Sequence, residues 1–107
     1  MNFDSGSARL SNIAKAKLDE VALKLKQDTE LRAHVEGHSD TTGSQTINDP
    51  LSMKRAESVK TYLVDRHDID PSRITIEGKG SSEPVASNDT AAGRAENRRA
   101  VIILKIL

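Results

Sequence analysis

Hydrophobic and polar residues repeat along this chain with two different periods, and each period predicts one kind of element. Apolar residues recur at three- and four-residue steps over 8–26 and again over 51–63, which is the spacing of amphipathic helices. Apolar and polar residues alternate over 31–36 and 73–77, as they do on half-buried strands, and 99–107 is the most β-prone run of the chain. The pattern therefore predicts two long helices and three full strands, with the last strand inside the sheet.

Shorter elements complete the predicted order. Residues 1–6 read as the end of a further strand that is cut within its length, and Asp89 or Thr90 is expected to cap a short helix that runs to about Asn97. The order is then βαβαβ, followed by a short helix and a last strand. We expect an α+β two-layer sandwich with a mixed four-stranded sheet and the long helices on one face. We also expect 1–107 to be a single domain, with a truncated first strand, excised from a longer protein.

A polar turn joins the second predicted strand to the second long helix and contains the most distinctive side chains. Gly37 is expected to end the strand, and Asp49 is expected to cap the helix, with Pro50 at its first position. Asp40 then lies at the carboxyl end of the strand and Arg55 on the second turn of the helix, so both face one crevice. An anion and a cation facing one crevice suit a zwitterionic ligand. The simpler interpretation is a partly exposed ion pair that contributes about 0–1 kcal/mol.

Composition and charge exclude several classes of function. The 107 residues fit one domain, and 16 basic against 16 acidic residues leave no net charge to attract nucleic acid. Aromatic residues make up only 2%, which argues against base-stacking surfaces. No apolar run approaches the roughly 20 residues that a membrane helix needs, so we expect no membrane insertion by this domain and any anchor or export signal to lie outside it. The absence of cysteine excludes disulfides but fits any compartment.

Several sequence blocks follow one another in the order typical of a known family. They are GHSDTTG at 37–43, N-x-x-LS-x-x-RA-x-x-V at 48–59, GKGSSEP at 78–84 and NDTAAGRAENRR at 88–99. Together they resemble the OmpA-like carboxyl-terminal domain, over nearly the whole chain. The resemblance implies noncovalent binding of the peptidoglycan stem peptide in the bacterial periplasm, as part of an outer-membrane or other envelope protein. It also implies that the domain is not an enzyme and needs no cofactor.

The resemblance assigns roles to individual residues. The ligand that it implies is diaminopimelate, whose side chain ends in an ammonium and a carboxylate. Asp40 would accept hydrogen bonds from the ammonium, and Arg55 would hold the carboxylate with both arms of its guanidinium. Ser39 stands where the family more often has threonine, and it keeps the hydroxyl. The supporting pocket residues are Asn48, Thr42 and Arg98, with the turn of Asp4, Ser5 and Gly6 as one wall.

Two functions of other classes remain open. On an extended strand the side chains of alternate residues project to one face, and here that face would carry His34, Glu36, His38 and Asp40. These ligand types suit a divalent metal, and a hydrolytic site is conceivable. We prefer no metal, because Gly37 is expected to end the strand too early. The second alternative is a protein-interaction module, with an envelope protein as a partner in place of peptidoglycan or in addition to it.

Other polar residues near the turn have structural interpretations. The run 38–40 (His-Ser-Asp) is not a catalytic triad, because consecutive side chains point apart. Residues 88–90 are expected to serve as turn and cap residues, and Arg94 to tie the loop to the sheet. Arg98 and Arg99 should point to different sides, so only Arg98 is a site candidate. The sequence does not decide whether the parent protein is a barrel, a lipoprotein or a stator.

Overall fold

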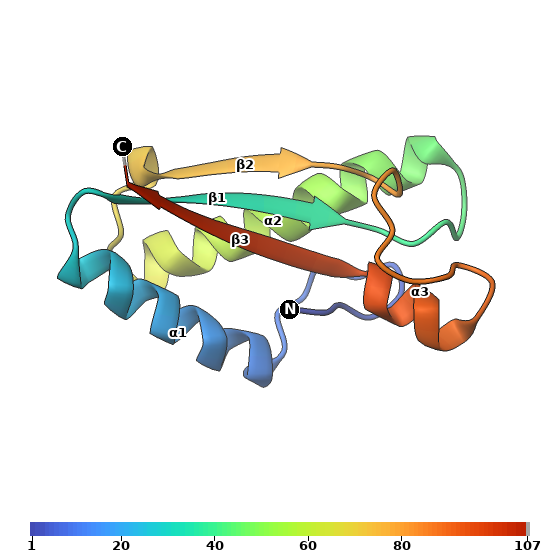
Figure 1. Ribbon diagram of the computed structural model, residues 1–107, viewed down its shortest axis with the longest axis horizontal. Coiled ribbons are helices and arrows are strands. Elements are labelled where there is room, and N and C mark those ends of the chain that lie inside the picture. Colours follow the sequence, from blue (N-terminus) through green and yellow to red (C-terminus); the bar gives the residue numbers. More distant parts are fainter. Residues whose placement is uncertain (107) are drawn as a thin grey trace.

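The computed structural model describes residues 1–106, in which helices and strands alternate along the chain (Figure 1). The long helices are α1 (Asn12–Gln27) and α2 (Gln45–His67), and a short helix, α3 (Ala91–Asn97), precedes the last strand. The strands are β1 (Leu31–His38), β2 (Ile74–Gly78) and β3 (Arg99–Ile106), with a 3-10 turn, η1 (Pro71–Arg73), before β2. Leu107, which the sequence pattern places in the last strand, lies outside the described residues.

The strands form one mixed sheet in the order β2-β1-β3. β1 is central, parallel to β2 and antiparallel to β3. The predicted α+β class and the mixed sheet are confirmed, but within residues 1–106 the sheet has three strands and not four. The expected first strand is reduced to a single bridge between Asn2 and Arg99, next to a hydrogen bond of 2.9 Å from the Phe3 N–H to the Arg98 carbonyl. Only the residues around Asn2 meet β3, and so short a run closes few ladder bonds.

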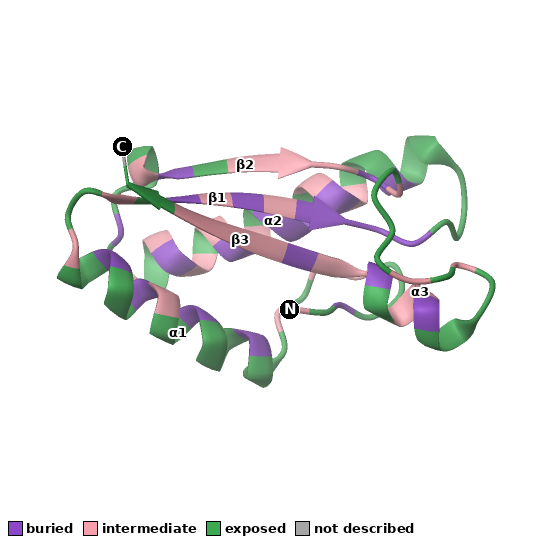
Figure 2. Cartoon of the chain, viewed as in Figure 1, coloured by how far each residue is buried: buried purple, intermediate pink, exposed green. Residues whose placement is uncertain are grey.

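The hydrophobic core lies between the long helices and one face of the sheet (Figures 1 and 2). In β1, Ala33 and Val35 are buried in this core, whereas Arg32, His34 and Glu36 alternate with them and lie on the other, open face. This is the period of two that the sequence predicts. The helices contribute the apolar stripes expected from their own period. Their core residues are Leu18, Ala22, Leu25, Ala56, Val59 and Leu63.

The ends of α1 and α3 are set by capping side chains. α1 begins at Asn12 rather than at Ala8, because Ser11 Oγ accepts the N–H of Ala14 at 3.1 Å and closes the first turn there. The short helix α3 is confirmed with Thr90 as its cap, whose hydroxyl accepts a backbone N–H at 3.0 Å.

No helix among residues 1–106 is long and apolar enough to cross a membrane.

α2 begins at Gln45, more than a turn before the predicted start. The Ser44 carbonyl accepts the N–H of Asn48 at 3.0 Å, so the residue at the amino end of the helix is Ser44 and not Asp49. Pro50 lies inside the helix rather than at its first position. It has no N–H to donate, but its fixed φ is helical, so the helix continues through it with the loss of one hydrogen bond.

β1 continues through Gly37 to His38, so the prediction that Gly37 ends the strand is wrong. The glycine serves a different purpose. A Cβ added at Gly37 would lie only 1.8 Å from the carbonyl oxygen of Ser52 in α2. The missing side chain therefore lets the backbones of β1 and α2 touch. This contact brings Arg55, three residues further along α2, to the end of β1.

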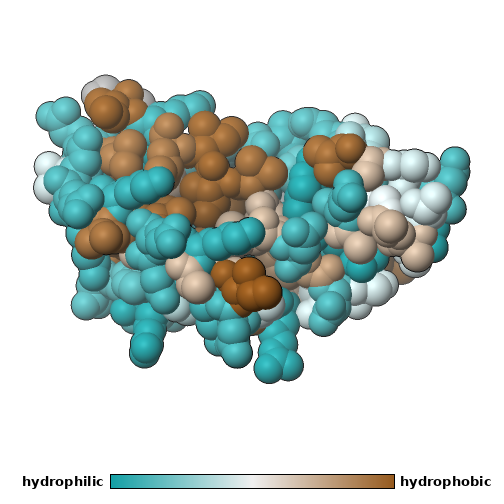
Figure 3. Space-filling view, turned by 60° about the horizontal axis from the view of Figure 1, so that its bottom comes forward, coloured by the Kyte–Doolittle hydropathy of each residue, from teal (hydrophilic) through white to brown (hydrophobic). Residues whose placement is uncertain are grey.

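β3 is an edge strand, although the sequence places it inside the sheet. One edge pairs with β1, and within residues 1–106 the other edge is covered only near Asn2. The remaining backbone N–H and C=O groups of that edge have no ladder partner among these residues. Residues 101–104 (Val-Ile-Ile-Leu) are all partly exposed, and Figure 3 shows apolar surface following β3.

Candidate functional site

The carboxyl end of β1 leads into two buried polar residues. Ser39 and Asp40 are 3% and 4% exposed. The Ser39 N–H donates to the Gly80 carbonyl at 2.9 Å, which ties the end of β1 to the loop after β2. Asp40 Oδ1 accepts the Thr42 N–H at 2.8 Å, and Oδ2 accepts a hydrogen bond from Arg98 Nη1 at 3.2 Å. One tight turn and one cation therefore fix the carboxylate.

The pKa of Asp40 lies below its usual value despite the burial of the side chain. Burial is the largest single influence and acts to raise the pKa, because it disfavours the charged form. The hydrogen bonds from Thr42 and Arg98, together with the Arg98 charge, act in the opposite direction and jointly outweigh it. Asp40 is consequently ionised at neutral pH.

Arg55 is fully buried and donates hydrogen bonds to three backbone carbonyls. Nε donates to Ser7 at 2.9 Å, Nη1 donates to His38 at 2.9 Å, and Nη2 donates to Asp4 at 3.1 Å. The guanidinium carbon also lies 5.3 Å from the centre of the Phe3 ring, within the range of a cation–π contact. The cation thus connects the end of β1 to the amino-terminal turn.

Asp40 and Arg55 do not form a direct ion pair. Burial lowers the pKa of Arg55 to about 10, while the charge of Asp40 raises it and that of Arg98 lowers it further. Among residues 1–106 the ion pair of Asp40 is with Arg98, at 3.2 Å. The interpretation of Asp40 and Arg55 as a partly exposed ion pair, which the sequence allowed, is therefore wrong. Both groups are buried and charged at neutral pH, and they interact through their electrostatic field.

The turn of Asp4, Ser5 and Gly6 lies beside Arg55. The Ser7 N–H donates to the Asp4 carbonyl at 3.1 Å, and Gly6 has a φ of +67°, which glycine adopts without strain. Arg55 binds the carbonyls at both ends of the turn, so a buried cation holds this wall even though the strand before it is only a bridge.

The other predicted pocket residues differ in exposure. Asn48 is buried on α2, where its i, i+4, i+7 spacing places it on one helix face with Ser52 and Arg55, whereas Thr42 is exposed. The hydroxyl of Ser39 is buried and has no hydrogen-bond partner among residues 1–106. An unpartnered buried hydroxyl is unfavourable. The Ser39 hydroxyl thus has free hydrogen-bonding capacity beside Asp40.

Two buried polar residues around the site were missed by the sequence analysis. Ser52 Oγ accepts the N–H of Gly80 at 2.8 Å and so fixes the loop after β2 against α2. The side chain of Asn97 accepts the N–H groups of Val85 and Ala86 at 2.8 and 3.0 Å and shapes the following loop. Ser52 could have been found from the sequence, because it is a small polar residue that lies one helical turn before Arg55 and therefore on the same face of the helix. Asn97 gave no comparable signal. It binds backbone groups of Val85 and Ala86 and the side-chain oxygen of Asn88, and the sequence does not show which residues of this loop it meets.

Arg98 and Arg99 point to different sides as predicted, whereas the partner predicted for Arg94 is wrong. Arg98 points toward Asp40, and Arg99 points elsewhere and donates to the Glu83 carbonyl at 2.9 Å. Arg94 donates to the Asn88 carbonyl at 2.9 Å, so it ties the loop to α3 rather than to the sheet.

Neither of the rejected chemistries forms at the end of β1. The ring nitrogens of His38 and the hydroxyl of Ser39 have no partners in the described part of the chain, so no triad connects them with Asp40. Among residues 1–106 the ligand atoms of His34, His38 and Asp40 are not brought together as a metal set. His34 instead lies with Glu36 and Glu77 on the open face.

The fold and the site together define an α+β domain with buried, fixed charges at the end of its central strand. The chain belongs to the OmpA family, which matches residues 2–98. It is 46% identical over 101 residues to outer membrane protein A of Bordetella avium, across 94% of this chain and 51% of that protein. It is 46% identical over 87 residues to the peptidoglycan-binding protein ArfA of Mycobacterium bovis, across 81% of this chain and 26% of that protein.

Solved structures agree with this assignment. The peptidoglycan-associated lipoprotein from Burkholderia pseudomallei has a TM-score of 0.92 at 28% identity, across 97% of this chain and 87% of that one. The resemblance to the OmpA-like domain is therefore confirmed. The chain spans about half or less of the length of the two curated relatives named above, 51% and 26%.

Proposed function

We propose that this domain binds peptidoglycan noncovalently and anchors its parent protein to the cell wall. Family membership supports this, since relatives are named as a peptidoglycan-binding protein and a peptidoglycan-associated lipoprotein. The observation that carries the proposal is the buried, ionised Asp40 beside the unpartnered hydroxyl of Ser39. The domain then works in the periplasm as one part, 1–107, of a longer envelope protein, by binding rather than by catalysis.

The ligand group is the diaminopimelate residue of the stem peptide. Its ammonium approaches Asp40, whose two oxygens offer about four acceptor positions. Protein hydrogen bonds from Thr42 and Arg98 occupy one position on each oxygen, so acceptor capacity remains. The Ser39 hydroxyl next to it supplies a further partner.

The carboxylate of the same group is assigned to Arg55. A guanidinium has five N–H donors, and Arg55 makes three hydrogen bonds to protein carbonyls. The donors left over are on Nη1 and Nη2, the pair that a carboxylate binds bidentately. The remaining positions of the pocket are taken by Asn48, Thr42, Arg98 and the wall formed by Asp4, Ser5 and Gly6.

The test is a pull-down on purified sacculi of the diaminopimelate type with the Asp40→Asn variant. Asparagine keeps the shape and the acceptor for the Thr42 N–H but removes the charge that faces the ammonium. Truncating one partner of a buried charge pair costs about 2–5 kcal/mol, so we expect an affinity loss of at least about tenfold.

The matched control is Asp65→Asn, which removes a carboxylate from an exposed position of α2. It should bind as the parent does, and circular dichroism should show an unchanged fold for both variants. Parent-like binding by a folded Asp40→Asn variant would contradict the role of Asp40. Failure of the parent itself to bind sacculi would contradict the function.

A further inference from the structure

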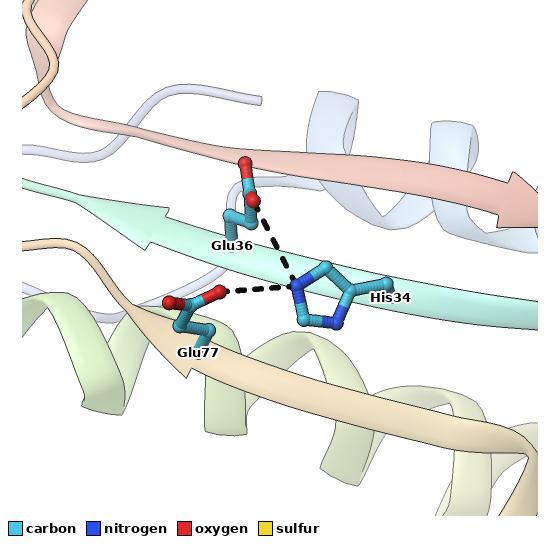
Figure 4. Close-up of side chains that lie close together, drawn as sticks. All are labelled: His34, Glu36 and Glu77. Carbon is cyan, nitrogen blue, oxygen red and sulfur yellow. Dashed lines mark hydrogen bonds and ion pairs between the residues drawn. The ribbon is translucent and has the colours of Figure 1, made fainter.

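The open face of the sheet carries a cluster that the proposed function does not use (Figure 4). His34 and Glu36 lie on β1 and Glu77 on β2, and one donor atom of each lies within 4.8 Å of the others. His34 Nε2 is 3.3 Å from Glu77 Oε1 and 3.7 Å from Glu36 Oε2. Figure 4 shows both carboxylates directed at this one nitrogen. We propose that the cluster binds a divalent transition-metal ion of the Zn²⁺ type.

The spacing of the donor atoms fits such an ion. Two ligand atoms that each lie about 2.1 Å from a tetrahedral Zn²⁺ are about 3.4 Å apart. The distances from His34 Nε2 to Glu77 and Glu36, 3.3 and 3.7 Å, are close to this value. One imidazole and two carboxylates form a ligand set that zinc accepts, with the fourth position open to water.

A second hydrogen bond prepares His34 for the role of ligand. His34 Nδ1 lies 2.7 Å from Thr75 Oγ1 on the neighbouring strand. When Nδ1 donates to this hydroxyl, Nε2 carries the lone pair and presents it to the two carboxylates. Metal-binding histidines almost always donate their other N–H to an oxygen in this way. Thr75 is therefore a positioning residue for the site.

A buried histidine provides independent support. His38 is 2% exposed, and neither of its ring nitrogens has a hydrogen-bond partner among residues 1–106. Its Nε2 lies 3.8 Å from Glu36 Oε1, so the two oxygens of Glu36 face the two histidines. A Glu36 carboxylate that coordinates a cation through Oε2 keeps Oε1 free to accept a hydrogen bond from His38. Cation binding thus gives the unpartnered ring a fixed acceptor.

A lysine competes for the same carboxylates. Lys79 Nζ lies 3.3 Å from Glu77 Oε2 and 3.9 Å from Glu36 Oε2. It also lies 3.4 Å from Glu83 Oε1, so it has another carboxylate to bind when a metal displaces it. A Lys79→Met variant should therefore bind zinc more tightly than the parent. A purely acidic surface patch that only attracts cations would also gain from this change, so the histidine variant decides between the two.

The experiment is a calorimetric titration of the untagged chain with ZnCl₂. We expect one Zn²⁺ per chain and a loss of affinity of at least about tenfold in both His34→Gln and Glu77→Gln, the loss expected for disturbed metal sites. The matched control is His67→Gln, because His67 forms a single histidine–carboxylate pair with Asp19 far from the cluster. Its affinity for zinc should equal that of the parent.

Several results would overturn the proposal. They are the absence of saturable binding up to about 1 mM Zn²⁺, an unchanged affinity in His34→Gln, or an equal loss in His67→Gln. Ca²⁺ offered at the same concentration is a further check, because imidazole favours zinc over calcium. Equal binding of Ca²⁺ would show that the cluster is a nonselective acidic surface and not a transition-metal site.

Discussion

At the scale of single residues, the proposed binding site consists of charges that are buried and held by hydrogen bonds. A buried ion is unfavourable unless hydrogen bonds compensate for its lost hydration. Arg55 obtains this compensation from the carbonyls of Asp4, Ser7 and His38, and Asp40 obtains it from a turn and from a cation. Both groups are therefore held in place before any ligand arrives, which lowers the cost of ordering them on binding.

We expect Asp40 to control how sacculus binding responds to acid. Its pKa is depressed in the folded protein, so ionised Asp40 stabilises the fold above the unfolded carboxyl value of about 3.9, and this stabilisation is lost as pH falls through the folded-state pKa. We expect sacculus binding to stay constant from neutral pH to about 4 and to fall only below that value. The measurement is bound fraction against pH, with circular dichroism at each point. A decline centred well above pH 4 in the folded protein would show that another group controls binding.

The residues of the candidate site were largely predictable, but their partners were not. Asp40 and Ser39 follow a strand and Arg55 lies on the next helix, so spacing brought them to one place. The Asp4 and Ser7 carbonyls that bind Arg55 belong to the backbone of a distant segment. Every residue has a backbone carbonyl, so the sequence cannot indicate which ones Arg55 binds. The pairing of Asp40 with Arg98 was missed for a related reason, since it depends on a strand register that spacing does not determine.

At the scale of elements, the contact between β1 and α2 positions the site. A Cβ at Gly37 would meet the Ser52 carbonyl oxygen at 1.8 Å and its carbon at 2.8 Å, both of them backbone atoms that a side-chain movement cannot relieve. Gly37→Ala should therefore push α2 away from β1 and carry Arg55 with it. We expect a loss of unfolding free energy of about 1–3 kcal/mol or more, measured by urea denaturation.

Gly43→Ala separates this packing effect from the general effect of replacing a glycine. Gly43 has a φ of +82°, and a Cβ there would meet only the end of the Ile47 side chain, at 3.7 Å. The substitution should cost only the backbone strain of a left-handed residue, about 1–2 kcal/mol, and should leave Arg55 in place. Equal losses of sacculus binding in the two variants would mean that the β1–α2 contact does not position the site.

The elements themselves were predicted in type better than in extent. Hydrophobic periodicity found both long helices and the strands β1 and β2, because burial on one face imposes the pattern directly. The short helix α3 was found from its capping residues and β3 from its β-prone composition. The predicted start of α2 was wrong because an Asp-Pro pair is typical of a helix start, whereas here the pair follows a first turn that already begins at Gln45. Gly37 was misjudged as a strand end because a glycine that permits a close contact looks the same in sequence as one that ends a strand.

At the scale of the whole molecule, β1 connects the two proposed sites. The carbonyl of His38 accepts a hydrogen bond from Arg55 on the side of α2, while its ring faces Glu36 on the open face. His38 therefore lies between the two proposed sites, with its backbone bound to Arg55 and its ring beside Glu36 of the cluster. The two sites are otherwise separated by the sheet, so variants of His34 or Glu77 test the metal without removing any group assigned to the wall ligand.

Binding of the ligand should stabilise the entire fold, because the site joins β1, α2, the amino-terminal turn and Arg98 before β3. A ligand that binds only the folded state at about 100 times its Kd adds about 2.7 kcal/mol to the unfolding free energy. For a domain of this size that corresponds to a rise in Tm of roughly 10 °C. A soluble stem peptide with diaminopimelate should produce this rise in the parent chain and a much smaller one in Asp40→Asn.

A lysine peptide at the same concentration keeps the ammonium but lacks the carboxylate assigned to Arg55. It should therefore raise the parent's Tm less, and scanning calorimetry with both peptides measures the difference. Equal shifts for the two peptides would show that Arg55 does not recognise the carboxylate, even if peptidoglycan binding itself holds.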